Sequence, residues 1–278
     1  MEFGPMHSLI YGLICGFTQF LPVPTEAHRA LYLQIIGSID EGIGSRMALH
    51  LGALLALMTA CAESVKRFRR EQRLANLPAR RRKRNPDRKT MLDLRLLRIA
   101  AVPFLLSVLA YSMRWQIETR YWLLAIVLAV NGIILYAPQF MPGANKNSLS
   151  LSAVDGFLIG VGGGLGTIPG ISGMGALTAI AKMLGTDRQY ALEFGLLLHI
   201  PMNVILLGIE FYRLISTGFG TVTPFAFFVF ILTTLVSYIS AYLGILMIRF
   251  ITVKSEGSGF AFYCWGLALF LFVLYLFT

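Results

Sequence analysis

Residues 16–28 read Gly-Phe-Thr-Gln-Phe-Leu-Pro-Val-Pro-Thr-Glu-Ala-His, and they interrupt the apolar segment Ser8–Ile36 with two prolines and several polar side chains. A second apolar segment, Asp155–Leu184, is interrupted by Pro-Gly-Ile-Ser-Gly-Met-Gly at residues 169–175. Each segment is too broken for one straight helix and too short for two complete crossings of a bilayer. We therefore predict two re-entrant helical hairpins whose breaks lie inside a membrane.

The rest of the chain supports a membrane setting. Hydrophobic residues make up 56% of the 278 residues and charged residues only 14%, whereas a soluble domain carries about a quarter charged residues. The composition and the apolar stretches predict an all-α polytopic membrane protein, one membrane domain over residues 1–278, with about six transmembrane helices. The stretches are Met47–Ala62, Ile99–Met113, Tyr121–Pro138, Leu192–Phe211, Phe225–Ile248 and Phe260–Phe277.

The net charge of +10 has a single origin. Residues 63–98 hold 14 lysines and arginines against four acidic residues, including the basic run Arg80–Arg84. The positive-inside rule predicts that this segment is a cytoplasmic loop, and its charge also attracts anionic membrane lipids. A basic loop between two membrane helices needs no nucleic acid to explain it, so we predict no nucleic-acid partner.

Counting membrane crossings outward from this cytoplasmic loop predicts the side from which each hairpin enters the membrane. The hairpin at residues 8–36 enters and leaves on the outer side, and the hairpin at residues 155–184 does so on the inner side. Opposed hairpins predict an inverted repeat, an arrangement typical of transporters. Residues 48–55, Ala-Leu-His-Leu-Gly-Ala-Leu-Leu, also match residues 191–198, Ala-Leu-Glu-Phe-Gly-Leu-Leu-Leu. We assign residues 1–62 to the start of the first repeat and residues 153–278 to the second.

The first break carries the strongest candidate site residues, because polar groups inside apolar segments are costly and usually functional. Thr25 or Glu26 is predicted to cap a helix that starts just after Pro24. Capping does not explain His28 and Arg29, which follow one turn later. We therefore predict that these residues face a ligand, with Thr25, His28 and Arg29 binding phosphate.

The second break is predicted to bind the same phosphate. Gly170, Gly173 and Gly175 would let backbone N–H groups approach a ligand, and a helix that begins near Ser172 would direct its positive end toward it. Close helix packing by small residues is the alternative explanation for the glycines.

Three further polar residues are predicted to line the cavity. Gln19 lies near the first break, and His50 and Glu193 occupy equivalent positions in the proposed repeat, where they would either line the cavity or bond one another. Cys15, Cys61 and Cys264 lie in apolar segments without the spacing of metal ligands. We predict no metal-ligating residues.

At these two breaks the chain resembles the undecaprenyl-pyrophosphate phosphatase family, integral membrane enzymes that recycle the polyprenyl carrier of bacterial cell-wall synthesis. The resemblance covers nearly the whole chain and includes residues 6–9, 16–28, 169–175 and 193–201. It implies six spans with two opposed re-entrant hairpins, a place in the bacterial inner (cytoplasmic) membrane, and a polyprenyl phosphate or pyrophosphate ligand. The family's histidine corresponds to His28 and its second-motif serine to Ser172.

The chain differs from the family pattern at the motif positions that carry the family's catalytic groups. The two acidic positions of the first motif are Cys15 and Gln19, and the second-motif arginine and its following serine are Gly173 and Met174. Glu26 is new and replaces a threonine. Hydrolysis of pyrophosphate needs a metal held on carboxylates or an arginine to neutralise charge, so the resemblance implies weak family-type catalysis at most.

Three functions remain open on the sequence. The first is a diverged member that binds a polyprenyl phosphate lipid and moves it between leaflets. The second is a phosphatase with a rearranged site, in which His28, Glu26, Thr25 and Ser172 act, Arg29 or Arg46 supplies the cation, and a divalent ion such as Mg or Ca assists. The third is a scaffold or regulator that acts through the basic loop. A homodimer is also left open.

Overall fold

The chain folds into a bundle of helices in the computed structural model, which describes residues 4–37, 41–83, 94–109, 120–141, 146, 150–218, 223–254 and 258–277. No strand occurs in these ranges; Lys146 and Thr186 form one isolated bridge. The helices are α1 (Pro5–Thr18), α2 (Thr25–Ile36), α3 (Ile43–Ala60), α4 (Ala62–Asn76), α5 (Leu94–Leu106), α7 (Tyr121–Tyr136), α8 (Ala153–Gly164), α9 (Gly173–Met183), α10 (Arg188–Thr217), α11 (Pro224–Lys254) and α12 (Gly259–Phe277). Short 3-10 turns are η1 (Ala79–Arg81), η3 (Ala137–Phe140) and η4 (Leu165–Thr167).

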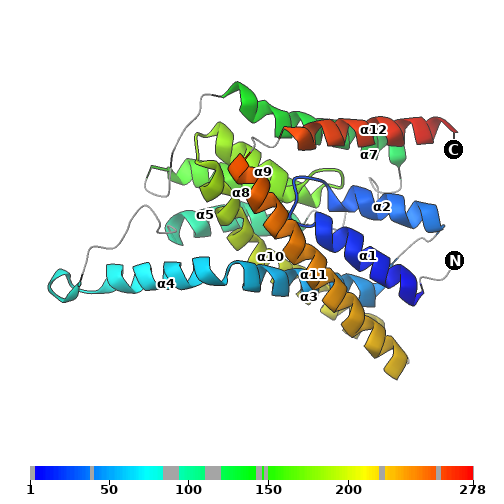
Figure 1. Ribbon diagram of the computed structural model, residues 1–278, viewed down its shortest axis with the longest axis horizontal. Coiled ribbons are helices and arrows are strands. Elements are labelled where there is room, and N and C mark those ends of the chain that lie inside the picture. The colour runs from blue at the N-terminus through cyan, green and yellow to red at the C-terminus, as the bar shows by residue number, and fades with distance from the viewer. Residues whose placement is uncertain are drawn as a thin grey trace.

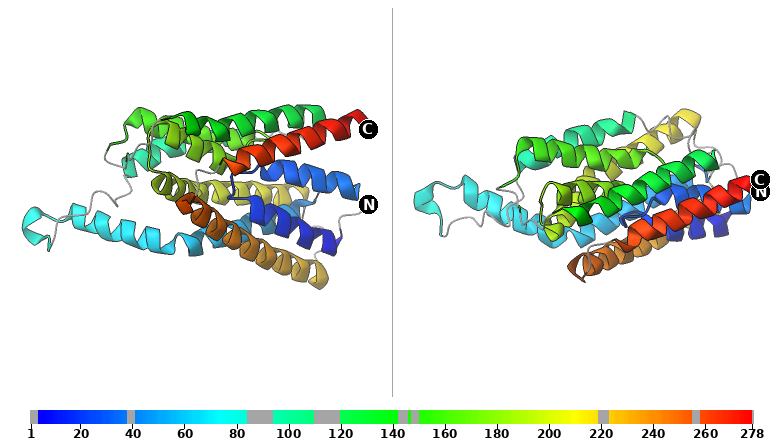
Figure 2. Two further views of the ribbon diagram at one scale, coloured as in Figure 1. Left: turned by 45° about the horizontal axis from the view of Figure 1, so that its top comes forward. Right: turned by 90° about the horizontal axis from the view of Figure 1, so that it is seen from above.

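The bundle has two distinct ends. Both termini lie at one end, which we call the terminal end, and α4 projects from the opposite end, which we call the α4 end (Figures 1 and 2). Helix α10 runs from the α4 end to the terminal end, because Glu193 near its start bonds Ser64 of α4 and Glu210 near its finish bonds Arg46 at the start of α3. The position of a residue along α10 therefore shows how far it lies from each end of the bundle.

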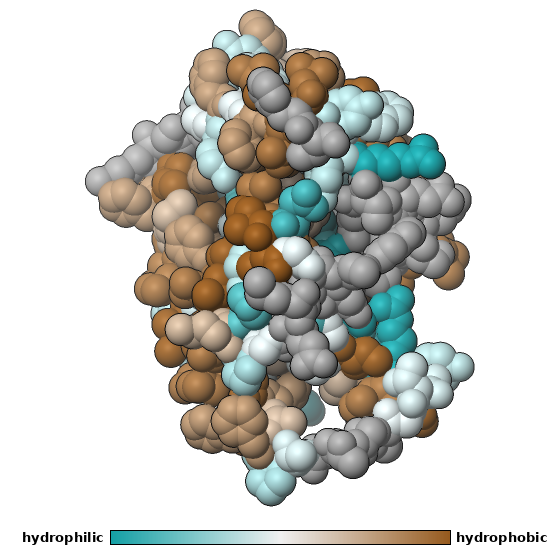
Figure 3. All heavy atoms as spheres, turned by 90° about the vertical axis from the view of Figure 1, so that its right-hand side faces the viewer, coloured by the Kyte–Doolittle hydropathy of each residue, from teal (hydrophilic) through white to brown (hydrophobic). Residues whose placement is uncertain are grey.

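Among the described residues, five helices are long and apolar enough to cross a membrane, namely α3, α7 with η3, α10, α11 and α12. Many of their exposed side chains are large and apolar, such as Ile126 and Ile133 on α7 and Leu243 and Phe250 on α11, as expected for surfaces that contact lipid. Seen from the terminal end, hydrophobic side chains cover one flank, and hydrophilic ones gather toward the middle and the opposite flank (Figure 3). These features confirm the predicted all-α polytopic membrane protein.

The sixth predicted span, residues 99–113, coincides in part with α5, which contains Pro103. Its last four residues lie outside the described part of the chain. The segment predicted as a basic loop is different: residues 62–76 form α4, which follows α3 after Cys61 and ends before Pro78. The predicted loop therefore contains a helix, and its place in the cytoplasm stays a prediction. Arg84 and the rest of residues 84–93 are not among the described residues.

Each predicted hairpin is a pair of short helices with a break between them. Helix α1 has 14 residues and α2 has 12, and α8 and α9 have 12 and 11, so each is too short to span a bilayer alone. Helix α2 starts at Thr25, as predicted, but its N-cap is Pro24 and no side chain caps it. The prediction of a Thr25 or Glu26 cap was therefore wrong, since neither side chain turns back to the helix start.

The first helix of each hairpin packs closely on a neighbouring helix through two glycines four residues apart. Gly12 and Gly16 of α1 contact the Ser237 region of α11, and Gly156 and Gly160 of α8 contact Leu96 and Ala100 of α5. Small residues at this spacing let helix backbones approach in membranes. The order α1, α2, α3 and then α8, α9, α10 is the one that an inverted repeat requires, and the repeat itself stays a prediction.

Candidate functional site

The breaks of the two hairpins meet in the middle of the bundle. Ser172 is the N-cap of α9, and its Oγ accepts the Gly175 N–H at 3.1 Å. The same hydroxyl donates to the Leu21 carbonyl of the first break at 2.9 Å. The Ser172 N–H donates to Asn131 Oδ1 of α7 at 3.0 Å. One buried serine thus starts the second half-helix, as predicted, and ties it to the first break.

A small cavity of about 90 Å³ lies beside this junction, on its terminal-end side. We call it the break pocket. Its polar lining brings together five of the predicted site residues, together with three polar residues that the sequence analysis did not single out. The predicted residues are Gln19, Thr25, Glu26, Ser172 and Gly173, and the others are Thr167, His199 and Asn203.

His199 and Asn203 lie one turn apart on α10 and point into the break pocket. His199 Nδ1 lies 2.8 Å from the Gly195 carbonyl, so the N–H is on Nδ1 and Nε2 is left as an acceptor. A methyl group at Gly173 would lie 3.6 Å from that Nε2. Both residues could have been found from the sequence, because each is polar within an apolar span.

His28, the predicted ligand-facing histidine, lies outside the break pocket. Its Nδ1 lies 2.8 Å from the Pro24 carbonyl, its Nε2 lies 2.6 Å from the Tyr263 hydroxyl of α12, and its ring stacks on that tyrosine. His28 instead lines a wide groove of about 990 Å³, which we call the apolar groove. Its walls come from α1, α11 and the start of α12, and Val23 lines both the groove and the break pocket.

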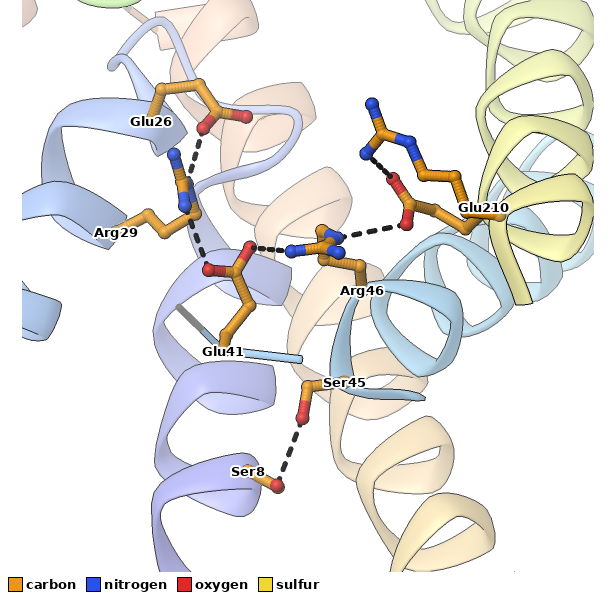
Figure 4. A network of polar contacts seen from close by, with 8 residues as sticks. Ser8, Glu26, Arg29, Glu41, Ser45, Arg46 and Glu210 are labelled. Atoms are coloured by element: carbon orange, nitrogen blue, oxygen red, sulfur yellow. Dashed lines mark hydrogen bonds and ion pairs between the residues drawn. The ribbon is translucent and has the colours of Figure 1, made fainter. Parts of the chain in front are cut away.

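Arg29 lies behind the break pocket in a buried row of alternating charges. Its guanidinium contacts Glu26 at 2.7 Å and Glu41 at 2.9 Å. Arg46 joins Glu41 at 3.6 Å to Glu210 at 2.9 Å. Figure 4 shows the row, which passes from α2 through the start of α3 to α10. The two arginines considered as phosphate-binding cations are therefore each held between two carboxylates.

The row continues to Arg213, whose guanidinium is 2.9 Å from Glu210. Glu41 is fully buried in the row, and only the two ends are partly exposed: the Glu26 side chain at 27% and the Arg213 side chain at 40%. Three carboxylates thus alternate with three guanidinium groups, and their formal charges cancel.

The glycines of the second break have distinct roles. Gly170 has a φ of 97°, which only glycine adopts readily. A Cβ at Gly173 would lie 3.1 Å from the Gly163 carbonyl oxygen, and one at Gly175 would lie 2.7 Å from the Leu135 side chain. Close packing therefore accounts for Gly173 and Gly175. Gly173 also lines the break pocket, whereas Gly170 and Gly175 do not.

His50 and Glu193 are not among the residues that line the break pocket. Glu193 accepts hydrogen bonds from Arg249 at 2.7 and 2.8 Å and from Ser64 at 3.2 Å, near the α4 end. His50 is a buried residue of α3. Glu193 is therefore bonded to Arg249 and Ser64, away from the break pocket.

The break pocket suits an anion by its backbone rather than by basic side chains. None of the described residues that line it is a lysine or an arginine. Helices α9 and α2 both begin at the wall of the pocket. Helix N-termini carry partial positive charge and N–H groups without a partner inside the helix. The Ser172 and Thr167 hydroxyls already donate to backbone carbonyls, so the further side-chain donors are Thr25 and the amides of Gln19 and Asn203. The pocket can therefore solvate a phosphate group without a full counter-charge.

A divalent cation does not fit these residues. Hard cations such as Mg²⁺ and Ca²⁺ prefer several carboxylate oxygens, but Glu26 is the one carboxylate among the lining residues that the structure describes, and it is paired with Arg29. Over the described residues, no group of three or more His, Cys, Asp or Glu side chains is placed to hold a metal ion.

Comparison with known proteins agrees with this architecture. The family model described as bacitracin resistance protein BacA matches residues 8–270. The chain is 28% identical to an undecaprenyl-diphosphatase from Nocardioides sp., over 90% of this chain and 89% of the relative. It is 30% identical to an undecaprenyl-diphosphatase from Pelotomaculum thermopropionicum, over 93% of this chain and 90% of the relative. The match spans both hairpins and the helices around the break pocket, and the chain belongs to the bacitracin resistance protein BacA family.

Proposed function

We propose that this protein binds the phosphate end of a polyprenyl phosphate or diphosphate in the break pocket and moves that lipid across the bacterial cytoplasmic membrane, without family-type hydrolysis. The observation that carries the proposal is the break pocket itself. It lies where two half-helices from opposed hairpins meet, and helix N-termini at such a point favour anionic ligands.

The loss of hydrolytic groups favours binding over cleavage. Gln19 is an uncharged amide in the pocket wall, where the family motif has an acid. Gly173 leaves no arginine to neutralise charge on a transferring phosphoryl group. Glu26 would repel phosphate, but Arg29 holds it at 2.7 Å and offsets its charge. These features keep hydrogen bonding and remove the charge stabilisation that hydrolysis needs.

The apolar groove supports a lipid as the ligand. It is lined almost entirely by apolar side chains, it borders the first break, and it shares Val23 with the break pocket. An isoprenoid chain in the groove would be in an apolar environment while its phosphate reaches the pocket. The name of the relatives, undecaprenyl-diphosphatase, points to the same class of lipid.

A phosphatase with a rearranged site is the second candidate, and His199 is the observation that favours it. Its Nε2 acceptor faces the break pocket near Ser172 and Thr25. A neutral imidazole in that position can act as a general base toward a water molecule. The route needs a charge-neutralising group that the pocket lining lacks.

A phosphate-release assay separates the two candidates. We expect purified protein, given a polyprenyl diphosphate with Mg²⁺, Ca²⁺ or chelator, to release no phosphate above the rate without protein. The charge-stabilising contacts that the family motifs supply are absent, and one such contact is typically worth about 10²–10³ in rate. Steady release that His199→Gln abolishes would reject the binding proposal and establish the second candidate.

A Thr25→Val variant tests the binding site directly. Removal of the hydroxyl, with little change in size, should weaken polyprenyl phosphate binding about tenfold, the effect of one hydrogen bond to a charged group. Thr59→Val is the matched control, because Thr59 bonds only its own helix at Leu55 and Ala56. Binding can be measured in nanodiscs of phosphatidylcholine. Equal affinity for both variants would remove Thr25 from the proposed site.

A further inference from the structure

A second small cavity lies on the opposite side of the hairpin junction. It measures about 60 Å³ and is lined by Pro22 of the first break and by Met174 and Gly175 at the start of α9. Along α10 it touches Arg188 and Leu192, whereas the break pocket touches residues 199–206 of the same helix. Since α10 runs from the α4 end to the terminal end, the second cavity faces the α4 end. We call it the α4-side pocket.

The α4-side pocket has the basic side chains that the break pocket lacks. Gly175, Thr178 and Lys182 follow one another at helical spacing and present one face of α9 to it. Arg188, at the start of α10, completes a pair of cations. Both cationic residues are partly buried. Their attraction for an anion is therefore less screened than it would be at a fully exposed surface.

The apolar groove joins the two pockets along one side. It shares Val23 with the break pocket and Ile251 with the α4-side pocket. Where the two breaks meet, the Ser172 hydroxyl donates to the Leu21 carbonyl. A ligand whose chain stays in the groove could therefore place its polar end on either side of the junction.

We propose that the α4-side pocket is a second phosphate site, in which Lys182 and Arg188 bind the headgroup of the same lipid on the α4 side of the membrane. This inference rests on the proposed function, because it supplies the opposite end of the translocation path. The positive-inside rule places the α4 end in the cytoplasm. The headgroup would leave the neutral break pocket and pair with two cations there, which is charge-assisted hydrogen bonding.

Cysteine protection can report the two pockets separately. Thr178→Cys places a thiol in the α4-side pocket and Thr167→Cys places one in the break pocket, while the native Cys15, Cys61 and Cys264 are buried. In phosphatidylcholine nanodiscs, a polyprenyl monophosphate should slow maleimide labelling at both introduced thiols. Inorganic pyrophosphate is the free-anion arm, and it should protect residue 178 only at much higher concentration.

Charge variants then test the cations. In the Thr178→Cys background, Lys182→Gln with Arg188→Gln should raise the lipid concentration for half-protection at least about tenfold. Lys182→Arg should keep protection near the parent level. Lys66→Gln is the matched control, because Lys66 is exposed on α4 and pairs with Glu63 at 3.1 Å. Unchanged size-exclusion and melting profiles would show that the variants are folded.

Each outcome decides one claim. Protection at residue 167 but not at residue 178, or protection at 178 that survives loss of both cations, overturns the second site and leaves the proposed function intact. Protection at residue 178 alone supports the second site and rejects the break pocket. Protection at neither rejects both. Equal protection by pyrophosphate and by the lipid would assign the α4-side pocket to a soluble anion and overturn the headgroup proposal.

Discussion

A Glu41→Ala variant is expected to melt far below the parent protein, with a loss of about 3–5 kcal/mol in the free energy of unfolding. Glu41 is fully buried and pairs with Arg29 and Arg46, whose side chains are only 8% and 11% exposed. Removal of the carboxylate leaves two buried guanidinium groups with less compensation, which costs more than the pair itself contributes. Thermal unfolding in detergent micelles, followed by circular dichroism, measures the change.

The matched control is Glu63→Ala. Glu63 also forms an ion pair, with Lys66 at 3.1 Å, but its side chain is 83% exposed. Exposed pairs contribute little to stability, so this variant should melt with the parent. If both variants lost the same stability, the buried row of charges would have no special structural role, and its place behind the break pocket would need another explanation.

A Gly160→Ala variant is the second change with a large expected effect. A Cβ at this position would lie 2.0 Å from the Ala100 carbonyl oxygen of α5, a backbone atom that no side-chain rotation can move away. We expect a loss of roughly 3 kcal/mol, the upper part of the usual range for overpacking. Since α8 leads directly into the second break, lipid binding should fall as well.

Gly208→Ala provides the comparison. Gly208 lies inside α10, and a Cβ there would have nothing within 4 Å. Alanine is favoured over glycine in a helix by about 1 kcal/mol, so this variant should be as stable as the parent or more so. A Gly160→Ala protein as stable as Gly208→Ala would contradict the close approach of α8 to α5.

Much of the fold follows from local sequence signals. Prolines and glycines in otherwise apolar segments were enough to predict both hairpins, and the starts of α2 at Thr25 and α9 at Gly173 agree with the predicted positions. Length and hydropathy predicted the spans within a few residues at most ends. The secondary structure of the basic segment was harder to predict, because charge indicates the side of the membrane on which a segment lies but not whether it is helical.

The site was only partly predictable, since a side chain's direction depends on tertiary packing. The sequence places His28 one turn after the first break, but the rotation of α2 turns it toward Tyr263 rather than into the break pocket. His199 is distant in sequence from both breaks, so neither break motif indicates it. The buried row of charges joins residues up to 164 positions apart, a distance at which no local spacing rule applies.

The buried row of charges has a consequence for movement. It fastens α2 to α3 and α10 through Arg29, Glu41, Arg46 and Glu210, so the first hairpin and these two long helices should travel as one rigid body. The second hairpin has its own contacts: Ser172 bonds Leu21 and Asn131, and α8 packs closely on α5. If the proposed transport takes place, a displacement of the second hairpin relative to the first would break the Ser172–Leu21 bond and leave the buried row of charges intact.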